Sequence, residues 1–496
     1  MYAKAASITA RQAVASNGLR LAVGSSILLA VAVVIARAVL ADSWLDEYWQ
    51  LWISGAPWDE LGGRLLADTH PPWFNLLARA ILFLAGGSLE TARVVSLIGA
   101  LGLLIAGTAR LSRFEQGWTA KRVYLFALMF ILVAGGPLSI GQLGDSFRSY
   151  PWIIAVSGLQ SLYLLQIAQG RAVDRNASFM AVLTIASVSL HLVHAVGAIA
   201  IALATVACAL QSGQRRVALF VGGAMLVGIF IDLSVVYFQS VQWALHNDYN
   251  WIGHSGVSAM MVFAESAKRT FLGSFVMTFI ILAAIVTSRL QPSDIWIVIP
   301  FPIAVLTWIL LDRITPILVD RYICSMLTLF CILSAAALDR LNPSHLLTIF
   351  TGMITIVHSA ANLAIDPPRR SWDSRARLIE SEVTKCPGAR VYAASAWLFT
   401  AGRGTRAAAF EDPVMRFAYQ RFASRGGFPL TYLDGIHAST IGYSVCPTIL
   451  WVDHAPGIAQ NSVDDVLKVV KLNRVPGLVV RRADSPDASV LMFDSR

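Results

Sequence analysis

Apolar runs long enough to cross a membrane dominate the first 365 residues of the chain. An α-helix needs about 20 predominantly apolar residues to cross the hydrocarbon core of a bilayer. By that criterion the sequence predicts eleven transmembrane helices. They cover residues 20–41, 91–110, 122–142, 150–168, 177–193, 195–211, 217–238, 270–288, 295–311, 317–338 and 345–364.

A further apolar run, 71–86, is ambiguous because it is short, carries Arg79 and opens with two prolines. Cytoplasmic loops collect Lys and Arg, so the loop charges decide. If 71–86 lies along the interface, the basic loops all share one side; if it crosses, the N-terminal cluster is separated from the rest. We therefore expect the N-terminus in the cytoplasm and 71–86 as an amphipathic juxtamembrane helix on the outer face. The basic residues on the inner side are then Lys4, Arg11, Arg20, Arg110, Arg113, Lys121, Arg122, Arg171, Arg175, Arg215, Arg216, Arg289 and Arg340.

Composition agrees with a polytopic membrane protein. The 496 residues are 56% hydrophobic and 14% charged, with a mean hydropathy of +0.62. The net charge of +9 follows from the basic loops and does not indicate a nucleic-acid partner. We expect contact with membrane lipids and no nucleic acid.

From residue 366 the chain becomes polar and mixed in charge. The segment "SWDSRARLIESEVTK" has helical periodicity, and "ARVYAASAW", "PTILWVDHA" and "GLVVRRA" are typical of strands. We predict a transmembrane domain over 1–365, with a first outer loop at 42–90, and a small extracytoplasmic α/β domain over 366–496. Cys386 and Cys446 could form a disulfide there if the compartment is oxidising.

The first outer loop carries the most suggestive acids. Asp46 and Glu47 are bracketed by Trp44, Tyr48 and Trp49, which indicates a partly desolvated aromatic surface. A carboxylate in such a place can act as a general base. The alternative is a solvated acid beside an interfacial aromatic belt. Asp42 and Asp68, in the same loop, are expected to be solvated loop residues.

Two arginines lie at the outer ends of predicted spans. "DSFRSYPW" places Arg148 and Tyr150 at the start of one span, and "ILVDRYICS" places Arg321 and Tyr322 just inside another. Arginine can clamp a phosphate, although it can also extend to the lipid headgroups. An ionisable residue within a span is a functional candidate by default, so Arg321 ranks above Arg148.

Histidines form a second set of candidates on the outer side. His70 precedes two prolines, which also suits a purely structural helix start. His191 and His194 are spaced to lie on one helix face. Two such histidines can bind metal, but no third ligand is evident, so we expect no metal centre. His254, in the loop 239–269, is a candidate acceptor contact or a plain loop residue.

In their order and common side these motifs resemble lipid-linked-sugar glycosyltransferases of the GT-C fold. The similarity is strongest to the branch that contains protein O-mannosyltransferases and aminoarabinose transferases. It rests on an Asp-Glu in the first outer loop, a His-Pro-Pro heading a helix that ends "FLAGGSLETARVVS", the Arg-x-Tyr span start "FRSYPW" and the late span "DRYICSMLTLF". It covers about the first 340 residues.

The resemblance implies an inverting glycosyltransferase of the inner (plasma) membrane with a periplasmic active site. Its donor would be a sugar on a polyprenyl monophosphate. Its acceptor would be a lipopolysaccharide, another glycolipid, a polysaccharide or a protein. Asp46 would be the general base, Glu47 its neighbour, and His70 would shape the donor cavity.

Charge assigns further expected roles in this scheme. We expect Arg148 and Arg321 to hold the departing phosphate, because a leaving anion needs stabilisation. Tyr150, Tyr322, His194 and His254 complete the candidate substrate contacts. No cofactor is expected; a divalent metal is conceivable but not required, because basic side chains can do its work. Asp145 departs from the pattern and could supplement or replace Asp46.

Two alternatives remain at the level of sequence. A lipid-linked-sugar flippase or transporter would also have many spans and buried arginines. Against it, the helices show no internal repeat and the polar residues gather on one side. A ligase or polymerase with diphosphate-linked donors would more often use a large later outer loop, and 239–269 is modest.

Overall fold

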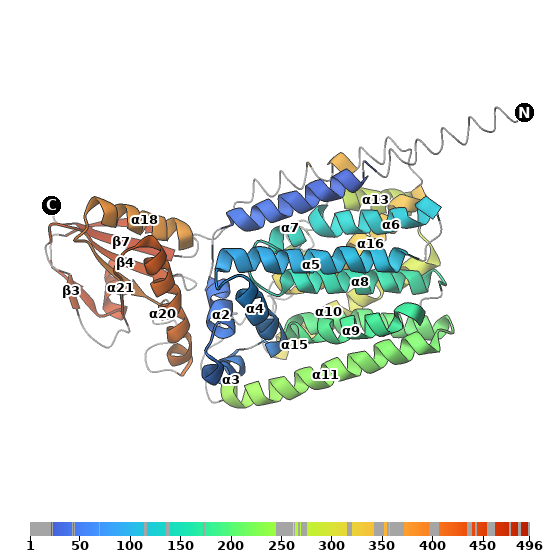
Figure 1. The fold of residues 1–496 in the computed structure, drawn as a ribbon, viewed down its shortest axis with the longest axis horizontal. Coiled ribbons are helices and arrows are strands. Elements are labelled where there is room, and N and C mark those ends of the chain that lie inside the picture. The colour runs from blue at the N-terminus through green and yellow to red at the C-terminus, as the bar shows by residue number, and fades with distance from the viewer. Residues whose placement is uncertain are drawn as a thin grey trace, which may run out of the picture. The chain divides into compact units, whose positions relative to one another are not determined.

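The computed structural model of this chain is shown in Figure 1. Its description covers residues 21, 23–41, 43, 45–68, 70–113, 117–134, 139–171, 174–244, 261, 263–265, 268, 275–314, 320–341, 352–354, 357, 372–395, 406–433, 439–441, 444–453, 462–475, 478–484 and 488–494. The chain forms two compact units, which are described in turn. The first comprises 1–40, 69–237 and 252–365; the second comprises 41–68, 238–251 and 366–496.

The first unit is a bundle of apolar helices (Figure 1). Between the helices, short 3₁₀ and π turns adjust the chain direction, as in η1 (Phe130–Ala134) and η5 (Asp320–Ile323). The helices are Val23–Leu40, α4 (Pro72–Leu84), α5 (Leu89–Ser112), α6 (Gly117–Met129), α7 (Ile140–Leu143), α8 (Tyr150–Ala168), α9 (Ala177–Ser189), α10 (Leu192–Gln211), α11 (Arg215–Ala244), α13 (Phe275–Val286), α14 (Ile295–Val298), α15 (Pro300–Ile314) and α16 (Cys324–Leu341).

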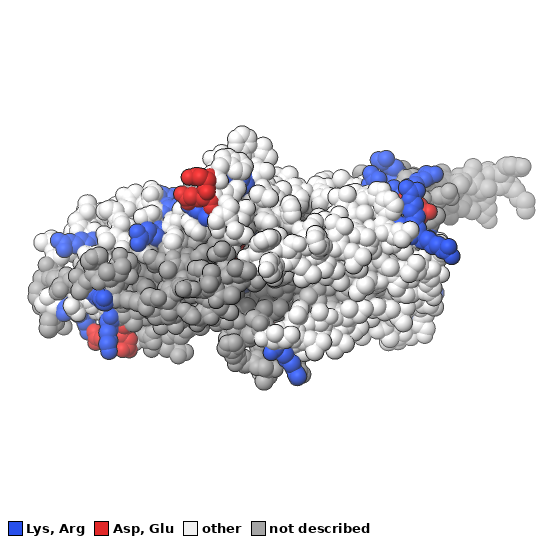
Figure 2. Space-filling model, turned by 90° about the horizontal axis from the view of Figure 1, so that it is seen from below, with Lys and Arg blue, Asp and Glu red and all other residues white. Residues whose placement is uncertain are grey.

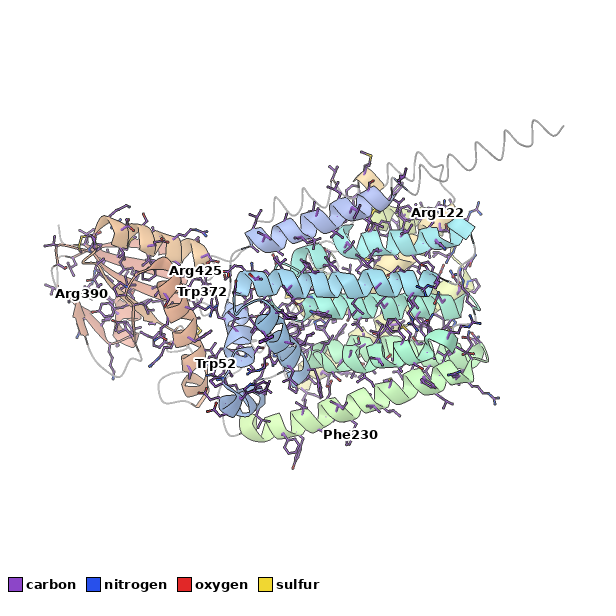
Figure 3. The ribbon with its side chains drawn as sticks, in the orientation of Figure 1. Trp52, Arg122, Phe230, Trp372, Arg390 and Arg425 are labelled. Atoms are coloured by element: carbon purple, nitrogen blue, oxygen red, sulfur yellow. A yellow bond between two sulfur atoms is a disulfide. The ribbon has the colours of Figure 1, made fainter. Side chains whose placement is uncertain are left out.

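Helices α8 and α16 form the centre of this bundle. In α8 89% of the span is buried and in α16 83%, against 28% in α11. Both central helices pack against α10, and α8 also packs against α5. A Cβ on Gly197 of α10 would lie 2.4 Å from the Ser325 hydroxyl of α16, so a glycine is what allows these two helices to approach. On α11, by contrast, Phe230 projects away from the bundle (Figure 3), as expected of a lipid-facing side chain.

Seven helices within the described part of the chain are long and apolar enough to cross a membrane. They match seven of the predicted spans. Of the others, 122–142 is α6 followed by the π turn η1, while 177–193 and 270–288 contain the shorter helices α9 and α13. Most of 345–364 lies outside the described residues. The count of eleven therefore stays a prediction, while the membrane location is clear from the seven helices.

The ambiguous run 71–86 contains helix α4. Its 13 residues rise only about 20 Å, less than the roughly 30 Å of the hydrocarbon core. One face is buried through residues such as Phe74 and Ile81, whereas Trp73 and Phe83 are exposed. The helix ends in a turn through Gly86 and Gly87, whose positive φ values of 62° and 78° favour glycine. Its length agrees with a helix that does not cross the bilayer, but its exposed residues are apolar, so the predicted amphipathic character is not seen.

Basic side chains gather at one end of the bundle (Figure 2), and the flank shown there is almost free of charge. This end holds the loops that the charge rule assigns to the cytoplasm. Ion pairs join the helix ends there: Arg122 lies 2.6 Å from Asp339, and Arg340 pairs with Asp294. Arg110 donates a hydrogen bond to Asn176 at 3.1 Å. Three of the predicted inner residues, Arg110, Arg122 and Arg340, thus take part in contacts between helix ends.

The second unit is an α/β domain joined by two helices from early in the chain. Its sheet has the order β2-β1-β4-β7-β6, with β2, β1 and β4 parallel and β7 and β6 antiparallel; β3 and β5 form a separate parallel pair. This confirms the predicted α/β character. The elements are α2 (Leu45–Ser54), α3 (Trp58–Ala67), α18 (Trp372–Lys385), β1 (Arg390–Ala394), α20 (Arg406–Gly426), β2 (Thr431–Tyr432), β3 (Ser439–Ile441), β4 (Thr448–Asp453), α21 (Val463–Val469), β5 (Leu472–Arg474), β6 (Val479–Asp484) and β7 (Ala488–Asp494).

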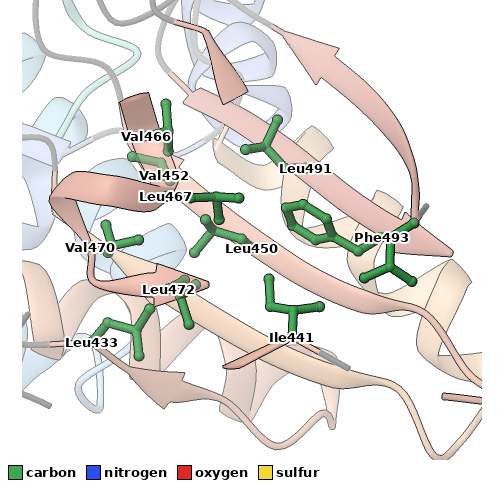
Figure 4. Close-up of a cluster of buried hydrophobic side chains, with 12 residues drawn as sticks. Leu433, Ile441, Leu450, Val452, Val466, Leu467, Val470, Leu472, Leu491 and Phe493 are labelled. Atoms are coloured by element: carbon green, nitrogen blue, oxygen red, sulfur yellow. The ribbon is translucent and has the colours of Figure 1, made fainter. Parts of the chain in front are cut away.

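The central strand β4 is buried on both faces, which explains its unbroken apolar sequence. Successive side chains of a strand point to opposite faces. Leu450 and Val452 enter a cluster with Leu491 and Phe493 (Figure 4). Trp451 points to the other face, where it meets aromatic side chains of α18 and α20.

A disulfide joins the end of α18 to the start of β4. It links Cys386 to Cys446, whose Cα atoms are 5.6 Å apart. The bridge that the sequence left open is thus present. Cys208, Cys324 and Cys331 are free and buried in the helical unit.

Candidate active site

The starts of three bundle helices meet at the end opposite the basic loops (Figure 1). Tyr150 begins α8, with Pro151 in its first turn, a position that suits proline because no N–H is needed there. His191 is the extended N-cap residue of α10, and Arg321 and Tyr322 lie in the turn η5 that leads into α16. Helix packing alone therefore brings polar residues from distant parts of the sequence together.

His191 lies at the centre of this cluster. Its ring centroid is 4.4 Å from that of His70, 4.8 Å from that of His194 and 4.8 Å from that of Tyr322. The ring of Tyr150 lies 6.2 Å away. His191 is 2% exposed, and neither ring nitrogen has a hydrogen-bond partner among the described residues. A buried polar group without a hydrogen-bond partner is unusual in a folded protein, and a bound ligand would provide the partner.

Two arginines add positive charge to the cluster. Arg321 Nε donates a hydrogen bond to Tyr150 Oη at 2.9 Å, and its guanidinium carbon lies 5.5 Å from the Tyr322 ring centroid. Arg148 is buried and Arg321 is half-buried, and both lie close enough to His191 for their charges to act on its ring. Since helix N-termini also carry partial positive charge, three helix starts and two guanidiniums make this end of the bundle suited to an anion.

His194 links two of the helices that form the cluster. It is fully buried on the first turn of α10, and its ring nitrogens lie 3.8 and 3.9 Å from Cys324 Sγ at the start of α16. Three histidines and a thiol in one region raise the question of metal. Among the described residues no group of three or more His, Cys, Asp or Glu is arranged to hold a metal ion. The expectation of a metal-free site stays a prediction.

The structure gives Asp145 a partner that the sequence analysis did not consider. Arg37, inside the first apolar helix, lies 3.2 Å from Asp145 Oδ2, and both side chains are largely buried. Removing either partner of a buried ion pair leaves an uncompensated buried charge, which destabilises a fold. This contact favours a structural role for Asp145 over that of a second base.

The acids of the first outer loop belong to the second unit. Asp46 and Glu47 lie in the first turn of α2, where negative charge is favourable; Asp46 is half-buried and Glu47 is fully buried. The expectation that Asp68 is a solvated loop residue is wrong, because it is 2% exposed at the C-cap of α3. Asp42 and His254 lie outside the described residues.

Most of the predicted substrate contacts are therefore found in one cluster. The central residue His191 was considered only as a possible metal partner of His194. The predicted residues that the cluster contains are His70, Arg148, Tyr150, His194, Arg321 and Tyr322.

The chain is similar in fold to a solved membrane protein. The crystal structure of ArnT from Cupriavidus metallidurans bound to undecaprenyl phosphate superposes with a TM-score of 0.50 at 12% sequence identity, covering 96% of this chain and 98% of that chain. The two chains share one fold. The same ArnT in the apo state gives a TM-score of 0.49 at 12% identity, covering 97% and 98%. No family model and no curated protein matches the sequence.

The likeness confirms the expected architecture across nearly the whole chain: an ArnT-like helical unit followed by a small sheet domain. The sequence resemblance had extended over only about the first 340 residues.

Proposed function

We propose that the protein is a membrane glycosyltransferase that moves a sugar from a polyprenyl-monophosphate donor to an extracytoplasmic acceptor. The observation that carries this proposal is the cluster of Arg148, Arg321, Tyr150 and His191 at the starts of three helices. Such an arrangement suits a phosphate whose negative charge grows as the sugar departs. The ArnT structure of the same fold holds undecaprenyl phosphate, a ligand of this chemical class.

We assign the two ends of the bundle to opposite sides of the membrane. The end rich in Lys and Arg faces the cytoplasm under the positive-inside rule, so the cluster faces the periplasm. The Cys386–Cys446 disulfide supports the same side for the C-terminal domain, because such bonds persist in oxidising compartments. Reporters fused after residues 115 and 430 should then report opposite sides, and a same-side result would overturn this topology.

In the proposed reaction Asp46 removes the proton from an acceptor hydroxyl. The resulting oxygen attacks the anomeric carbon from the face opposite the phosphate, so a new carbon–oxygen bond forms as the bond to the phosphate oxygen breaks, with inversion. The proton stays on Asp46, and the polyprenyl phosphate leaves as an anion held by Arg148 and Arg321. Glu47 supports Asp46 within the same helical turn. The role of Asp46 rests on the family resemblance of its motif.

The proposal is tested by incubating the purified full-length protein with a radiolabelled polyprenyl-phosphate sugar and membrane extract. We expect label to move into an acceptor fraction. Arg321→Gln should raise the KM for the donor and lower kcat, whereas Arg313→Gln, an exposed arginine at the end of α15, should resemble the parent. Donor crossing the bilayer with no transferred label would contradict the proposal and favour a flippase. An equal loss of activity in Arg321→Gln and Arg313→Gln would contradict the role given to Arg321.

A further inference from the structure

The helix that carries Asp46 and Glu47 is packed against the C-terminal domain, a contact that the proposed chemistry does not itself require. Within the second unit, α2 packs along α20. The Tyr48 ring lies 4.6 Å from the Phe422 ring, centroid to centroid, in a tilted arrangement. Tyr48 and Phe422 are each at most 2% exposed, so this contact is part of a core.

Phe422 belongs to an aromatic layer on one face of the sheet. Trp372 stacks on Phe422 at 5.5 Å, and Tyr419 meets Trp451 of β4 edge to face at 4.9 Å. Aromatic pairs at these separations contribute about 0.5–1.5 kcal/mol each beyond the area that they bury. Tyr48 therefore connects α2 to this aromatic layer.

A polar contact fixes the entry to α2 as well. The Ser43 backbone N–H donates to Asp373 Oδ2, and Arg425 forms an ion pair with the same carboxylate. The Arg425 guanidinium lies 5.3 Å from the Phe422 ring centroid. Figure 3 shows Arg425 and Trp372 close to each other, on α20 and α18. Asp373, which is 5% exposed, thus joins the chain just before α2 to helices α18 and α20.

We propose that the C-terminal domain positions the general base, with Asp373 and Phe422 as positioning residues that hold α2. Residues two apart on a helix are about 200° apart around its axis and do not face each other. Tyr48 therefore turns one side of α2 to the domain, while Asp46 lies on the opposite side. The domain thus packs against the side of α2 that is opposite Asp46. This inference rests on the proposed function.

The test compares Asp373→Asn with Glu382→Gln in the full-length protein. Glu382 lies on the same helix α18 and pairs with Lys385 at 2.7 Å and Arg481 at 3.0 Å, so its variant also weakens ion pairs of this domain. Tyr48→Leu is a second variant, which removes the aromatic contact from the α2 side and leaves the domain residues unchanged. Each protein is measured by hydrogen–deuterium exchange over residues 45–54 and by sugar-transfer kinetics.

We expect Asp373→Asn and Tyr48→Leu to speed exchange in α2 about tenfold and to lower kcat by about 10- to 100-fold, because a shift of about 1 Å in a catalytic group can cost that much. The KM for the donor should change less than about twofold, because α2 does not bind the phosphate in this proposal. Glu382→Gln should change neither quantity.

Unchanged exchange and kcat in both α2-directed variants would overturn the inference. So would equal losses in Glu382→Gln, because the effect would then be general destabilisation. If the parent itself transfers no sugar, the proposed function fails separately, and the exchange measurement still decides whether the domain holds α2.

Discussion

Removing the hydroxyl of Tyr150 should weaken the donor site without disturbing its packing. In the structure this oxygen accepts a hydrogen bond from Arg321 Nε at 2.9 Å. Tyr150→Phe removes that single acceptor and keeps the ring contacts with His191 and His194, at 6.2 and 5.9 Å. Arg321 then loses one of the contacts that orient its guanidinium.

The expected effect follows from the charge on the donor of this bond. A hydrogen bond that involves a charged group contributes about 1.5–3 kcal/mol. At about 1.36 kcal/mol for each factor of ten, kcat/KM for the donor should fall by about 10- to 160-fold. Initial rates measured over a range of lipid-linked donor concentrations give this quantity directly.

Tyr163→Phe is the matched control. Tyr163 lies on the same helix α8 and is fully buried, but it is 13 positions further along the helix, which separates the two residues by about 20 Å. We expect this control to keep kcat/KM within about twofold of the parent. A Tyr150→Phe variant that also stays within twofold, or an equal loss in both variants, would refute the role given to the Arg321–Tyr150 bond.

Three further predictions concern the structure around the site. Cys386→Ser with Cys446→Ser opens a loop closed over a sequence separation of 60 residues, so the C-terminal domain should lose about 4 kcal/mol of stability in chemical denaturation, and an unchanged midpoint would contradict this. Lys385 and, to a smaller extent, Arg481 hold the pKa of Glu382 below its ordinary value of 4.5. This carboxylate should therefore stabilise the fold above pH 4.5 and lose that effect as pH falls through its lower folded pKa. The Tm values of the parent and of Glu382→Gln should differ at neutral pH and converge in acid, and a difference that stays constant with pH would contradict the assignment. Gly197→Ala places a Cβ 2.4 Å from the Ser325 hydroxyl and should lower stability in detergent by about 1–3 kcal/mol, with an unchanged Tm as the opposing result.

The spans were predictable from sequence where a single continuous apolar run forms the whole helix. Runs such as Leu89–Ser112 and Leu192–Gln211 are continuous and apolar, so length and composition suffice. The same criterion predicted one helix over 122–142 and did not predict that the π turn η1 follows α6. Such a turn depends on tertiary packing as much as on composition. Loop charge then assigned one common side to the basic helix ends, and Figure 2 shows basic side chains at one end.

The site was predictable in part for a related reason. Arg148, Tyr150 and Arg321 were predicted as candidates because polar residues at the start of an apolar run are conspicuous, and the structure places them in one cluster. The pairing of Arg37 with Asp145 was not found, because it joins residues 108 positions apart. The Tyr48–Phe422 contact was missed likewise, since only the folded chain brings α2 to the domain. Asp68 was misjudged because sequence position does not reveal burial.

The most direct test of the central claim is sugar transfer by the purified parent and by Asp46→Asn from a polyprenyl-monophosphate donor. General base catalysis contributes about 10²- to 10⁴-fold. The account predicts that the parent transfers the sugar with inversion and that Asp46→Asn lowers kcat by at least about 100-fold with little change in the KM for the donor. Absence of transfer by the parent, or undiminished transfer by Asp46→Asn, would contradict it.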